Sequence, residues 1–144
     1  MKIENLSLKD KPIIMKIWKA QGDIFGIPYN SEIDGLIKKE QFICMKENNQ
    51  IIAICAYKKN KNLIKICHLW VAKKYRKKHI AIKLIASIIE KNIDCDFYVT
   101  CKSGAENNTF YDKFKLKEPS IEHRLTIDIR KYYLDKNKIM ESVK

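Results

Sequence analysis

Residues 68–91, which read HLWVAKKYRKKHIAIKLIASIIEK, decide the fold because the hydrophobic pattern changes in the middle of the segment. The apolar run that ends at Val71 is typical of a strand, and the segment AKKYRKK after it is a polar turn. After the turn, apolar residues recur at helical spacing, at Ile80, Leu84, Ile85, Ile88 and Ile89. The next apolar run, CDFYVTC at residues 95–101, again predicts a buried strand. A strand, a helix and a strand form a crossover unit, so we expect the two strands to be parallel.

The rest of the sequence predicts an antiparallel sheet around this unit, because turn-prone segments of hairpin length separate several strand-like runs. The strand that ends at Val71 is expected to begin at residue 63, and the expected further strands cover residues 2–6, 41–46, 51–58 and 121–129. Additional helices are expected after Ser7, after Ser31 and at residues 105–114. We therefore expect an α/β fold with a mixed, mostly antiparallel sheet of six to seven strands and helices on both faces.

The length of 144 residues fits a single domain. We expect residues 1–129 to form its body and residues 130–144 to form a helical or flexible tail of the same domain. No apolar run approaches the length of a membrane span, and residues 1–11 lack the apolar core of a signal peptide. These features predict a cytoplasmic protein that does not insert into a membrane.

The chain has five cysteines, an odd number, and no two of them form a CxxC pair. This pattern argues against a disulfide framework and against a zinc site, so we expect no metal. Most of the cysteines lie in apolar runs and are expected to be buried. Cys101 ends a strand near the expected site, and its use as an acyl carrier stays an alternative.

The net charge of +12, from 29 basic and 17 acidic residues, raises the possibility of a nucleic-acid partner. Arginine reads bases and phosphates better than lysine does, and only three of the basic residues are arginines. The sequence is rich in Lys, Asn and Ile together, as coding from an AT-rich genome tends to give. The charge is therefore interpreted either as a functional basic face or as a product of composition.

The segment from His68 to Lys91 resembles the cofactor-binding segment of the GNAT N-acetyltransferases. That family has a strand that ends in a Leu-x-Val triplet, a polar turn, and an Arg/Gln-x-x-Gly-x-Gly/Ala signature that opens a helix. The order of strands and helices around the segment also matches the family. His79 is a departure, because it stands where the family usually has glycine. The residues matched to the triplet and the signature are Leu69, Trp70, Val71, Arg76, Lys77, Lys78, His79, Ile80 and Ala81.

The resemblance implies a GNAT-like fold that binds acetyl-CoA as the acyl donor. A helix N-terminus presents free backbone N–H groups and a positive dipole end, which suit a pyrophosphate. By resemblance, a bulge in the strand that ends at Val71 separates it from its parallel neighbour, and the thioester would lie in the gap. The exposed backbone of that strand would pair with the pantetheine amides, as another strand would.

A second resemblance lies at residues 109–116, TFYDKFKL, which match a late-helix motif of the family. By this match Tyr111 is the general acid that protonates the departing CoA thiolate, a role that suits a phenol. Lys115 and Leu116 replace the Gly-Phe pair of the family motif. Gly104 replaces an asparagine found near the cofactor in many members, and Asn107 or Asn108 is the candidate to take over that contact.

His68 is the candidate general base, because its pKa near 6.5 suits proton removal from an amine. If His68 shares a face with Ile66, its side chain points to the core instead. By resemblance, the acceptor pocket involves the loop after the first helix and the last strands. The acceptor contacts expected there are Phe25, Ile27, Tyr29, Glu32 and Glu122.

The expected activity is transfer of an acetyl group from acetyl-CoA to a primary amine by direct attack in a ternary complex. The expected partner is a small-molecule or peptide amine, and a homodimer is an open possibility. The alternatives are an acyltransferase that acts on nucleic acid or aminoacyl-tRNA, and a non-catalytic binding module with the same fold.

Overall fold

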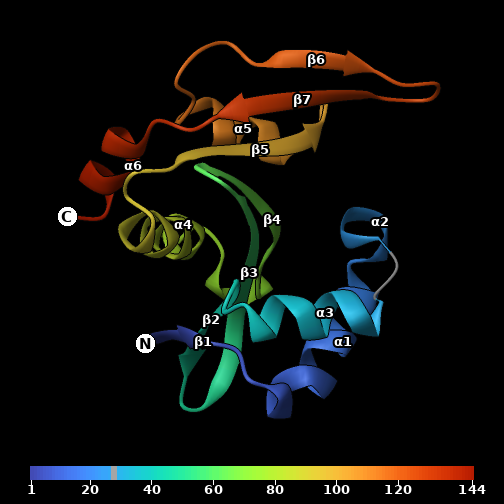
Figure 1. Cartoon of the computed structure of the whole chain (residues 1–144), viewed down its shortest axis with the longest axis vertical. Coiled ribbons are helices and arrows are strands. Elements are labelled where there is room, and N and C mark those ends of the chain that lie inside the picture. Colours follow the sequence, from blue (N-terminus) through green and yellow to red (C-terminus); the bar gives the residue numbers. More distant parts are fainter. Residues whose placement is uncertain (27–28) are drawn as a thin grey trace.

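The computed structural model describes residues 1–26 and 29–144, and its centre is one mixed, seven-stranded sheet (Figure 1). The strand order is β1-β2-β3-β4-β5-β7-β6. All neighbouring pairs are antiparallel except β4 and β5, which are parallel. The strands are β1 (Lys2–Asn5), β2 (Phe42–Glu47), β3 (Gln50–Asn60), β4 (Leu63–Val71), β5 (Asp96–Lys102), β6 (Ser120–His123) and β7 (Asp128–Tyr133). The expected fold class and the expected parallel pair are both confirmed.

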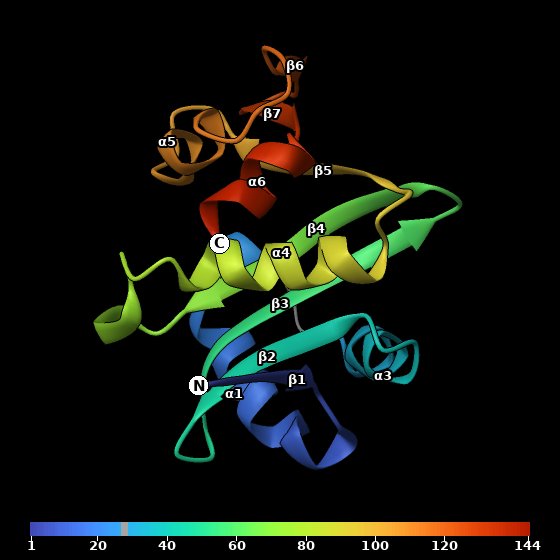
Figure 2. The same ribbon diagram turned by 90° about the vertical axis from the view of Figure 1, so that its left-hand side faces the viewer.

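Helices cover both faces of the sheet, as Figure 2 shows for α4 and α1. The α-helices are α1 (Lys11–Ala20), α2 (Gly22–Phe25), α3 (Asn30–Lys38), α4 (Ile80–Lys91), α5 (Asn107–Asp112) and α6 (Lys136–Ser142). The 3-10 turns are η1 (Leu8–Asp10) and η2 (Lys73–Tyr75). Residues of α4, α5 and α6 belong to one buried apolar cluster, and residues of α1, α2 and α3 belong to a second. The sheet therefore separates two cores that lie on opposite faces.

The entry to α1 follows from its local sequence. The Ser7 backbone N–H donates to Asp10 Oδ2 at 3.0 Å, so the two residues form a capping box around η1. Pro12 lies in the first turn of α1, where its missing N–H costs no hydrogen bond. Ile14 and Trp18 of α1 are fully buried, four residues apart on the sheet-facing side.

Two sequence expectations need correction. The prediction of a single last strand over residues 121–129 was wrong, because β6 and β7 form a hairpin that turns at residues 124–127. Residues 130–133 belong to β7, and Tyr132 is fully buried while its hydroxyl donates to Asp112 Oδ1 at 3.0 Å. Only α6 in the expected tail is helical, and its Ile139 is also fully buried. The strand was missed because residues 130–133, RKYY, do not alternate between polar and apolar residues.

A further difference lies in the loop expected after the first helix, because residues 22–25 form the short helix α2. The Trp18 indole N–H donates to Gly26 O at 3.1 Å and holds the end of α2 against α1. Gly26 has a φ of 81°, a conformation that glycine adopts without strain. Tertiary contact therefore stabilises a helix that is too short to form alone.

Candidate active site

The site is organised by the place where β4 and β5 part. The two strands pair only over Leu63–Ile66 of β4 and Asp96–Val99 of β5. Beyond Ile66, β4 continues for five residues to Val71, whereas β5 continues to Lys102 beside β7. The strands therefore open into a gap whose rims are the last residues of β4 and β5.

A β-bulge in β4 coincides with the start of this gap. Ala56 pairs with Cys67 and Ile54 pairs with Trp70, so both His68 and Leu69 lie opposite Cys55. His68 has a φ of 51°, the left-handed conformation that side chains rarely adopt. The bulge expected from the family resemblance is thus present, and it has a second effect on the direction of His68.

The bulge turns His68 away from the face that simple alternation predicts for it. Ile66 and Leu69 pack on the α4 side of the sheet. Cys67 and His68, the two residues between them in the sequence, have their side chains on the other side of the sheet. The His68 ring centroid lies 4.0 Å from that of Trp18 and 5.1 Å from that of Phe25. The side chain of His68 therefore lies on the side of α1 and α2, next to the gap.

The backbone of Val71 points into the gap. The Ala72 N–H donates to Ile52 O at 2.8 Å, and consecutive residues of a strand point their polar groups to opposite edges. The N–H and C=O of Val71 therefore point away from β3, and Arg76 Nε donates to Val71 O at 3.0 Å. The free edge of β4 can pair with an extended ligand as an added strand would.

The turn between β4 and α4 has the backbone conformation that the family signature requires. His79 is the N-cap residue with a φ of 61°, and Lys77 has a φ of 63°. Glycine in the family signature suits the left-handed conformation, and here His79 adopts it despite its side chain. The departure at His79 therefore leaves the backbone geometry of the turn in place.

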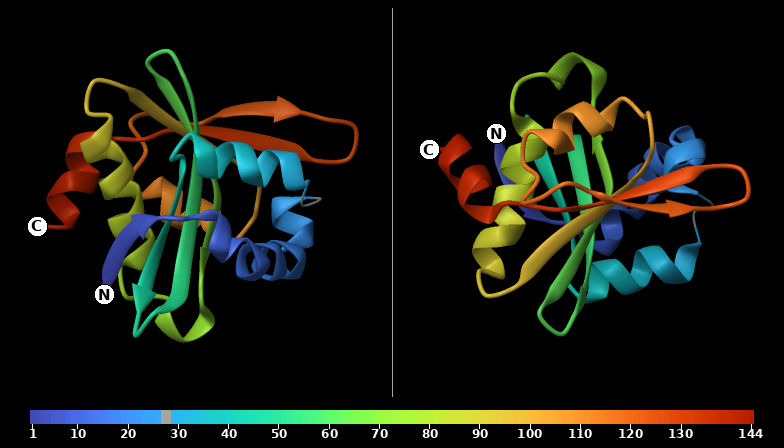
Figure 3. Two further views of the ribbon diagram at one scale, coloured as in Figure 1. Left: turned by 60° about the horizontal axis from the view of Figure 1, so that its bottom comes forward. Right: turned by 90° about the horizontal axis from the view of Figure 1, so that it is seen from above.

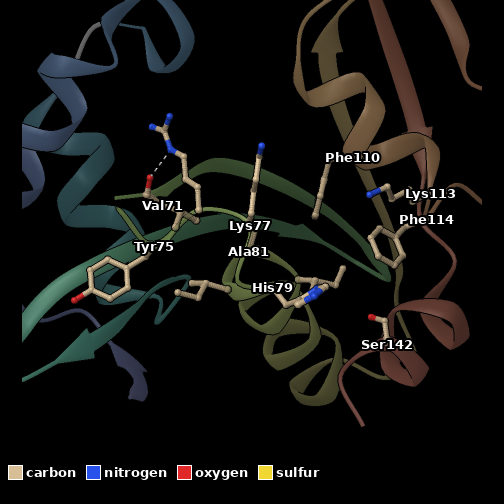
Figure 4. Close-up of a pocket in the computed structure, with 12 residues that line it drawn as sticks. Val71, Tyr75, Lys77, His79, Ala81, Phe110, Lys113, Phe114 and Ser142 are labelled. Carbon is tan, nitrogen blue, oxygen red and sulfur yellow. Dashed lines mark hydrogen bonds between the residues drawn. The ribbon is translucent and has the colours of Figure 1, made fainter. Parts of the chain in front are cut away.

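A cavity of about 460 Å³ lies between this turn, the end of β4 and α5 (Figure 4). In Figure 4, Phe110 of α5 and the next residues along the chain, Lys113 and Phe114, lie across from the N-terminal turn of α4. The lining residues that the sequence predicted are Val71, Arg76, Lys77, His79, Ile80 and Ala81. Those it missed are Tyr75, Ile82, Phe110, Lys113, Phe114 and Ser142. Phe110 and Phe114 were detectable in principle, because residues four apart share a helix face.

Several predicted cofactor residues lie beside this cavity rather than in its wall. Leu69 packs on the α4 side, and Trp70 packs on the opposite face of the sheet. Lys78 is exposed, with its Nζ 5.7 Å from the centroid of the Tyr75 ring. The cavity walls still combine cationic side chains, apolar surface and a helix N-terminus, which fits a pyrophosphate joined to a pantetheine chain.

Asn107 is exposed at the start of α5, and it is not part of the cavity wall. Its neighbour Asn108 is buried and accepts a hydrogen bond from the Gly104 N–H at 3.0 Å. The Asn108 amide also donates to Lys102 O at 3.0 Å. Asn108 therefore fixes the connection between β5 and α5, and it does so from inside the protein.

Tyr111 lies in the core on the α4 side and is 4% exposed. Its ring packs against Phe110 and Tyr132, with centroids 5.1 and 6.0 Å apart. Burial raises the pKa of the Tyr111 hydroxyl far above its ordinary value, and the nearby thiols of Cys55 and Cys101 act in the same direction. Tyr111 therefore keeps its proton over the whole working range of pH.

His68 has two polar neighbours on its side of the sheet. His68 Nε2 lies 3.4 Å from Glu32 Oε1, and Lys58 Nζ lies 3.2 Å from the same oxygen. Burial lowers the pKa of the His68 imidazole, and this effect exceeds the opposing effect of the Glu32 carboxylate. At neutral pH the imidazole is thus uncharged and can accept a proton.

The residues expected around the acceptor are dispersed. Phe25 is buried against Trp18, with ring centroids 5.6 Å apart, so it supports His68 from within the core. Tyr29 is 59% exposed, and Ile27 lies outside the described residues. Glu122 is exposed on β6, where Arg124 donates to its carboxylate at 3.2 Å. Glu32 makes the polar contact with His68, and Phe25 packs against the His68 ring.

Among the residues that the structure describes, no three His, Cys, Asp or Glu side chains are grouped as metal ligands. The helices in the described ranges are all too short or too polar to cross a membrane.

Comparison with known proteins identifies the family. The sequence profile described as "Acetyltransferase (GNAT) domain" matches residues 28–122, more than half of the 144-residue chain. No curated protein sequence matches the chain. The N-acetylglutamate synthase from Neisseria gonorrhoeae, solved with coenzyme A and N-acetyl-glutamate, superposes with a TM-score of 0.70 at 14% identity. The match covers 92% of this chain and 35% of that one, so this chain spans about a third of that protein.

Two further solved structures match over nearly their full length. The ribosomal-protein-S18-alanine N-acetyltransferase from Escherichia coli has a TM-score of 0.71 at 14% identity, over 92% of both chains. A spermidine N-acetyltransferase from Vibrio cholerae has a TM-score of 0.69 at 14% identity, over 100% of both chains. At these identities the superpositions demonstrate a shared fold, and the profile match carries the assignment. The protein belongs to the GNAT acetyltransferase family, and acetyl-CoA is its acyl donor.

Proposed function

We propose that the protein is an N-acetyltransferase that moves the acetyl group of acetyl-CoA to a primary amine by direct attack in a ternary complex. The observation that carries this proposal is the gap between β4 and β5, which has different chemistry on its two sides. The α4 side offers the cavity and the helix N-terminus. The opposite side offers the uncharged imidazole of His68 beside Glu32.

His68 removes the proton of the acceptor ammonium, directly or through a water molecule. The amine nitrogen then bonds to the thioester carbonyl carbon, and the Val71 N–H is directed into the gap to stabilise the oxyanion. Collapse of the tetrahedral intermediate breaks the carbon–sulfur bond. Tyr111 donates its proton to the departing thiolate, and the second proton of the attacking nitrogen returns through water to the Tyr111 oxygen. The products are therefore an amide and a free thiol, and the tyrosine hydroxyl is restored.

A covalent acyl-enzyme is not needed in this scheme. Burial raises the pKa of the Cys101 thiol, which disfavours the thiolate that would have to attack. The Asn108 side-chain amide donates a hydrogen bond to Cys101 Sγ at 3.2 Å. An amide cannot act as a base, so it cannot remove the proton of the thiol. Direct transfer is therefore the route that the side chains of the site support.

The fold relatives act on chemically different amines, as their names state: glutamate, an alanine of a ribosomal protein and the polyamine spermidine. What these acceptors share is an amine that must lose a proton before attack. We accordingly propose a primary amine as the acceptor group of this protein, with its amine at the His68 side of the gap.

The test is steady-state release of free thiol from acetyl-CoA while acetyl-CoA and a panel of primary amines are varied together. Direct transfer predicts amine-dependent thiol release, with double-reciprocal lines that intersect because both substrates are bound at once. Parallel lines would indicate an acyl-enzyme instead. Binding of acetyl-CoA with no amine-dependent release from any member of the panel would count against the proposal.

A further inference from the structure

One face of the sheet lies next to the proposed acceptor site and has a composition of its own. On β5 and β7, Phe97, Val99 and Tyr132 point to the α4 side and are buried. By alternation, Tyr98 and its cross-strand partner Tyr133 point to the opposite side, where both are partly exposed. The described members of the core under α1, α2 and α3 come from β2, β3 and β4 but not from β5 or β7. These helices therefore leave the tyrosine face open.

Lysines surround the two tyrosine rings. The ring centroids of Tyr98 and Tyr133 lie 6.0 Å apart, and Lys131 Nζ lies 4.5 and 5.1 Å from them. Lys117 Nζ lies 5.3 Å from the centroid of Tyr133. Lys65 of β4 is the register partner of Tyr98 and extends the basic surface toward the centre of the sheet. We refer to Lys65, Tyr98, Lys117, Lys131 and Tyr133 as the tyrosine–lysine face.

The tyrosine–lysine face runs continuously to the proposed general base. Lys58 of β3 is the register partner of Lys65, and Lys58 Nζ contacts the carboxylate of Glu32, which in turn contacts His68. His68 lies three residues beyond Lys65 on β4, which corresponds to about 10 Å along a strand. The β6–β7 hairpin extends to the same side of the molecule as α2 (Figures 1 and 3), so it flanks the path between the face and the base.

We propose that single-stranded nucleic acid binds across the tyrosine–lysine face, and that the acceptor amine is carried on that nucleic acid. The proposal rests on the proposed function, because it names the molecule that presents the amine to His68. Tyrosine rings on an open sheet stack bases of any sequence, and lysines along the strands neutralise the phosphates between them. The net charge of +12 of the whole chain adds a long-range attraction for a polyanion.

The aromatic pair favours nucleic acid over an acidic peptide as the occupant. The carboxylates of an acidic peptide would pair with the lysines. Such a peptide lacks the regularly spaced planar groups that would stack on two neighbouring tyrosine rings. The carboxylates near the face do not cancel its charge, because Glu32 contacts Lys58 and Glu122 is paired with Arg124. Asp96, at the start of β5, is on the same face as Tyr98, and its one negative charge is fewer than the three lysines of the tyrosine–lysine face.

The experiment measures fluorescence anisotropy of a labelled oligouridylate of about twelve nucleotides, a length within the usual range for such sites. An abasic strand of equal charge is the comparison probe. We expect the full-length protein to bind the oligouridylate about tenfold more tightly than the abasic strand, and Tyr98→Leu and Tyr133→Leu each to remove most of this preference. Equal affinity for the two probes would overturn the proposal, because it would show attraction by charge alone.

Lys131→Gln provides a second variant that depends less on folding, because it changes a surface cation. We expect it to reduce the slope of log affinity against log salt by about 0.7, the value for one phosphate of a single strand. Lys9→Gln, the same change at an exposed position before α1, is the matched control and should leave the slope unchanged. An equal reduction in both variants would contradict a defined binding face.

The link to catalysis is tested by acetyl transfer to a terminal aminoalkyl group, either on the oligouridylate or on the free aminoalkyl alcohol. We expect kcat/KM to be about tenfold higher for the amine on the oligonucleotide, and Tyr98→Leu to abolish that advantage. Equal kcat/KM values would refute this inference and leave amine acetylation intact. Failure of the wild-type protein to bind acetyl-CoA would instead refute the proposed function, whatever the outcome of the anisotropy experiment.

Discussion

The two sides of the gap between β4 and β5 are built in different ways. On the α4 side, the site consists mainly of backbone: the free edge at Val71, the left-handed turn at His79 and the N-terminus of α4. On the other side, it consists of side chains from distant segments, with His68 held between Trp18 and Glu32. The backbone groups of the donor side persist when their side chains change, whereas each side-chain contact of the site is lost with one substitution.

This contrast explains how the chain keeps the fold of its family although His79 replaces the usual glycine of the signature. The donor side needs a particular backbone shape, and His79 supplies that shape at the cost of some strain. The acceptor side needs particular groups in contact, and there the sequence is free to specify a different substrate. The predictions that follow test the contrast from the largest expected effect to the smallest.

Tyr111→Phe is expected to have the largest effect. The phenylalanine keeps the buried ring and its packing against Tyr132 but cannot donate a proton to the thiolate. We expect kcat to fall about a hundredfold, with little change in the affinity for acetyl-CoA. Single-turnover kinetics and calorimetry measure the two quantities. A variant with wild-type turnover would remove Tyr111 from the mechanism.

His68→Gln is expected to lower kcat/KM about tenfold, because water replaces the base. Only the uncharged imidazole accepts a proton, and burial lowers its pKa below the usual value. The activity of the wild-type protein should therefore fall on the acid side with a midpoint below 6.5, the usual value for an imidazole. The pH profile of His68→Gln should lack this acid limb. Retention of the same limb in the variant would assign it to another group.

Glu32→Gln sharpens this second prediction, because the Glu32 carboxylate opposes the effect of burial on the His68 pKa. Removal of the negative charge should shift the acid limb of kcat/KM to lower pH. Glu32→Gln keeps the size of the side chain, so it separates charge from packing. A limb that moves to higher pH would contradict the contact between the two residues.

Arg76→Ala is expected to weaken acetyl-CoA binding about fivefold, which is the loss of one exposed charged contact. The guanidinium lines the cavity and also donates to Val71 O, so its removal affects both charge and the position of the turn. Lys19→Ala, at an exposed position on α1, is a control that removes the same charge far from the cavity. Calorimetric titration of both variants measures the difference, and equal affinities would mean that Arg76 does not contact the donor.

His79→Gly is expected to have the smallest effect, and a favourable one. Glycine relieves the left-handed strain, but it also gains freedom in the unfolded chain, so the free energy of unfolding should rise by less than about 1 kcal/mol. His79→Ala keeps a β-carbon and should show no gain. Urea denaturation of the two variants gives the comparison. A destabilised His79→Gly variant would show that the imidazole makes a stabilising contact.

The two sides also differed in how far the sequence could predict them. The crossover unit and the turn at residues 76–81 were predictable, because hydrophobic spacing and a local signature determine backbone shape. Ser142 of α6 was not, because only the tertiary fold brings it to the cavity. The direction of His68 was not predictable either, since a bulge shifts every later side chain of β4 to the other face. The hairpin of β6 and β7 was missed because β6 is short and exposed, and because β7 has charged residues beside its partly buried ones.

The most direct test of the account is calorimetric titration of acetyl-CoA into the wild-type protein and into Ala81→Trp. Ala81 lies in the first turn of α4 and lines the cavity, so an indole at this position would occupy the space assigned to the donor. The account predicts binding of one acetyl-CoA per wild-type chain and loss of that binding in a folded Ala81→Trp variant. Equal affinity of the two proteins would contradict the placement of the donor on the α4 side of the gap.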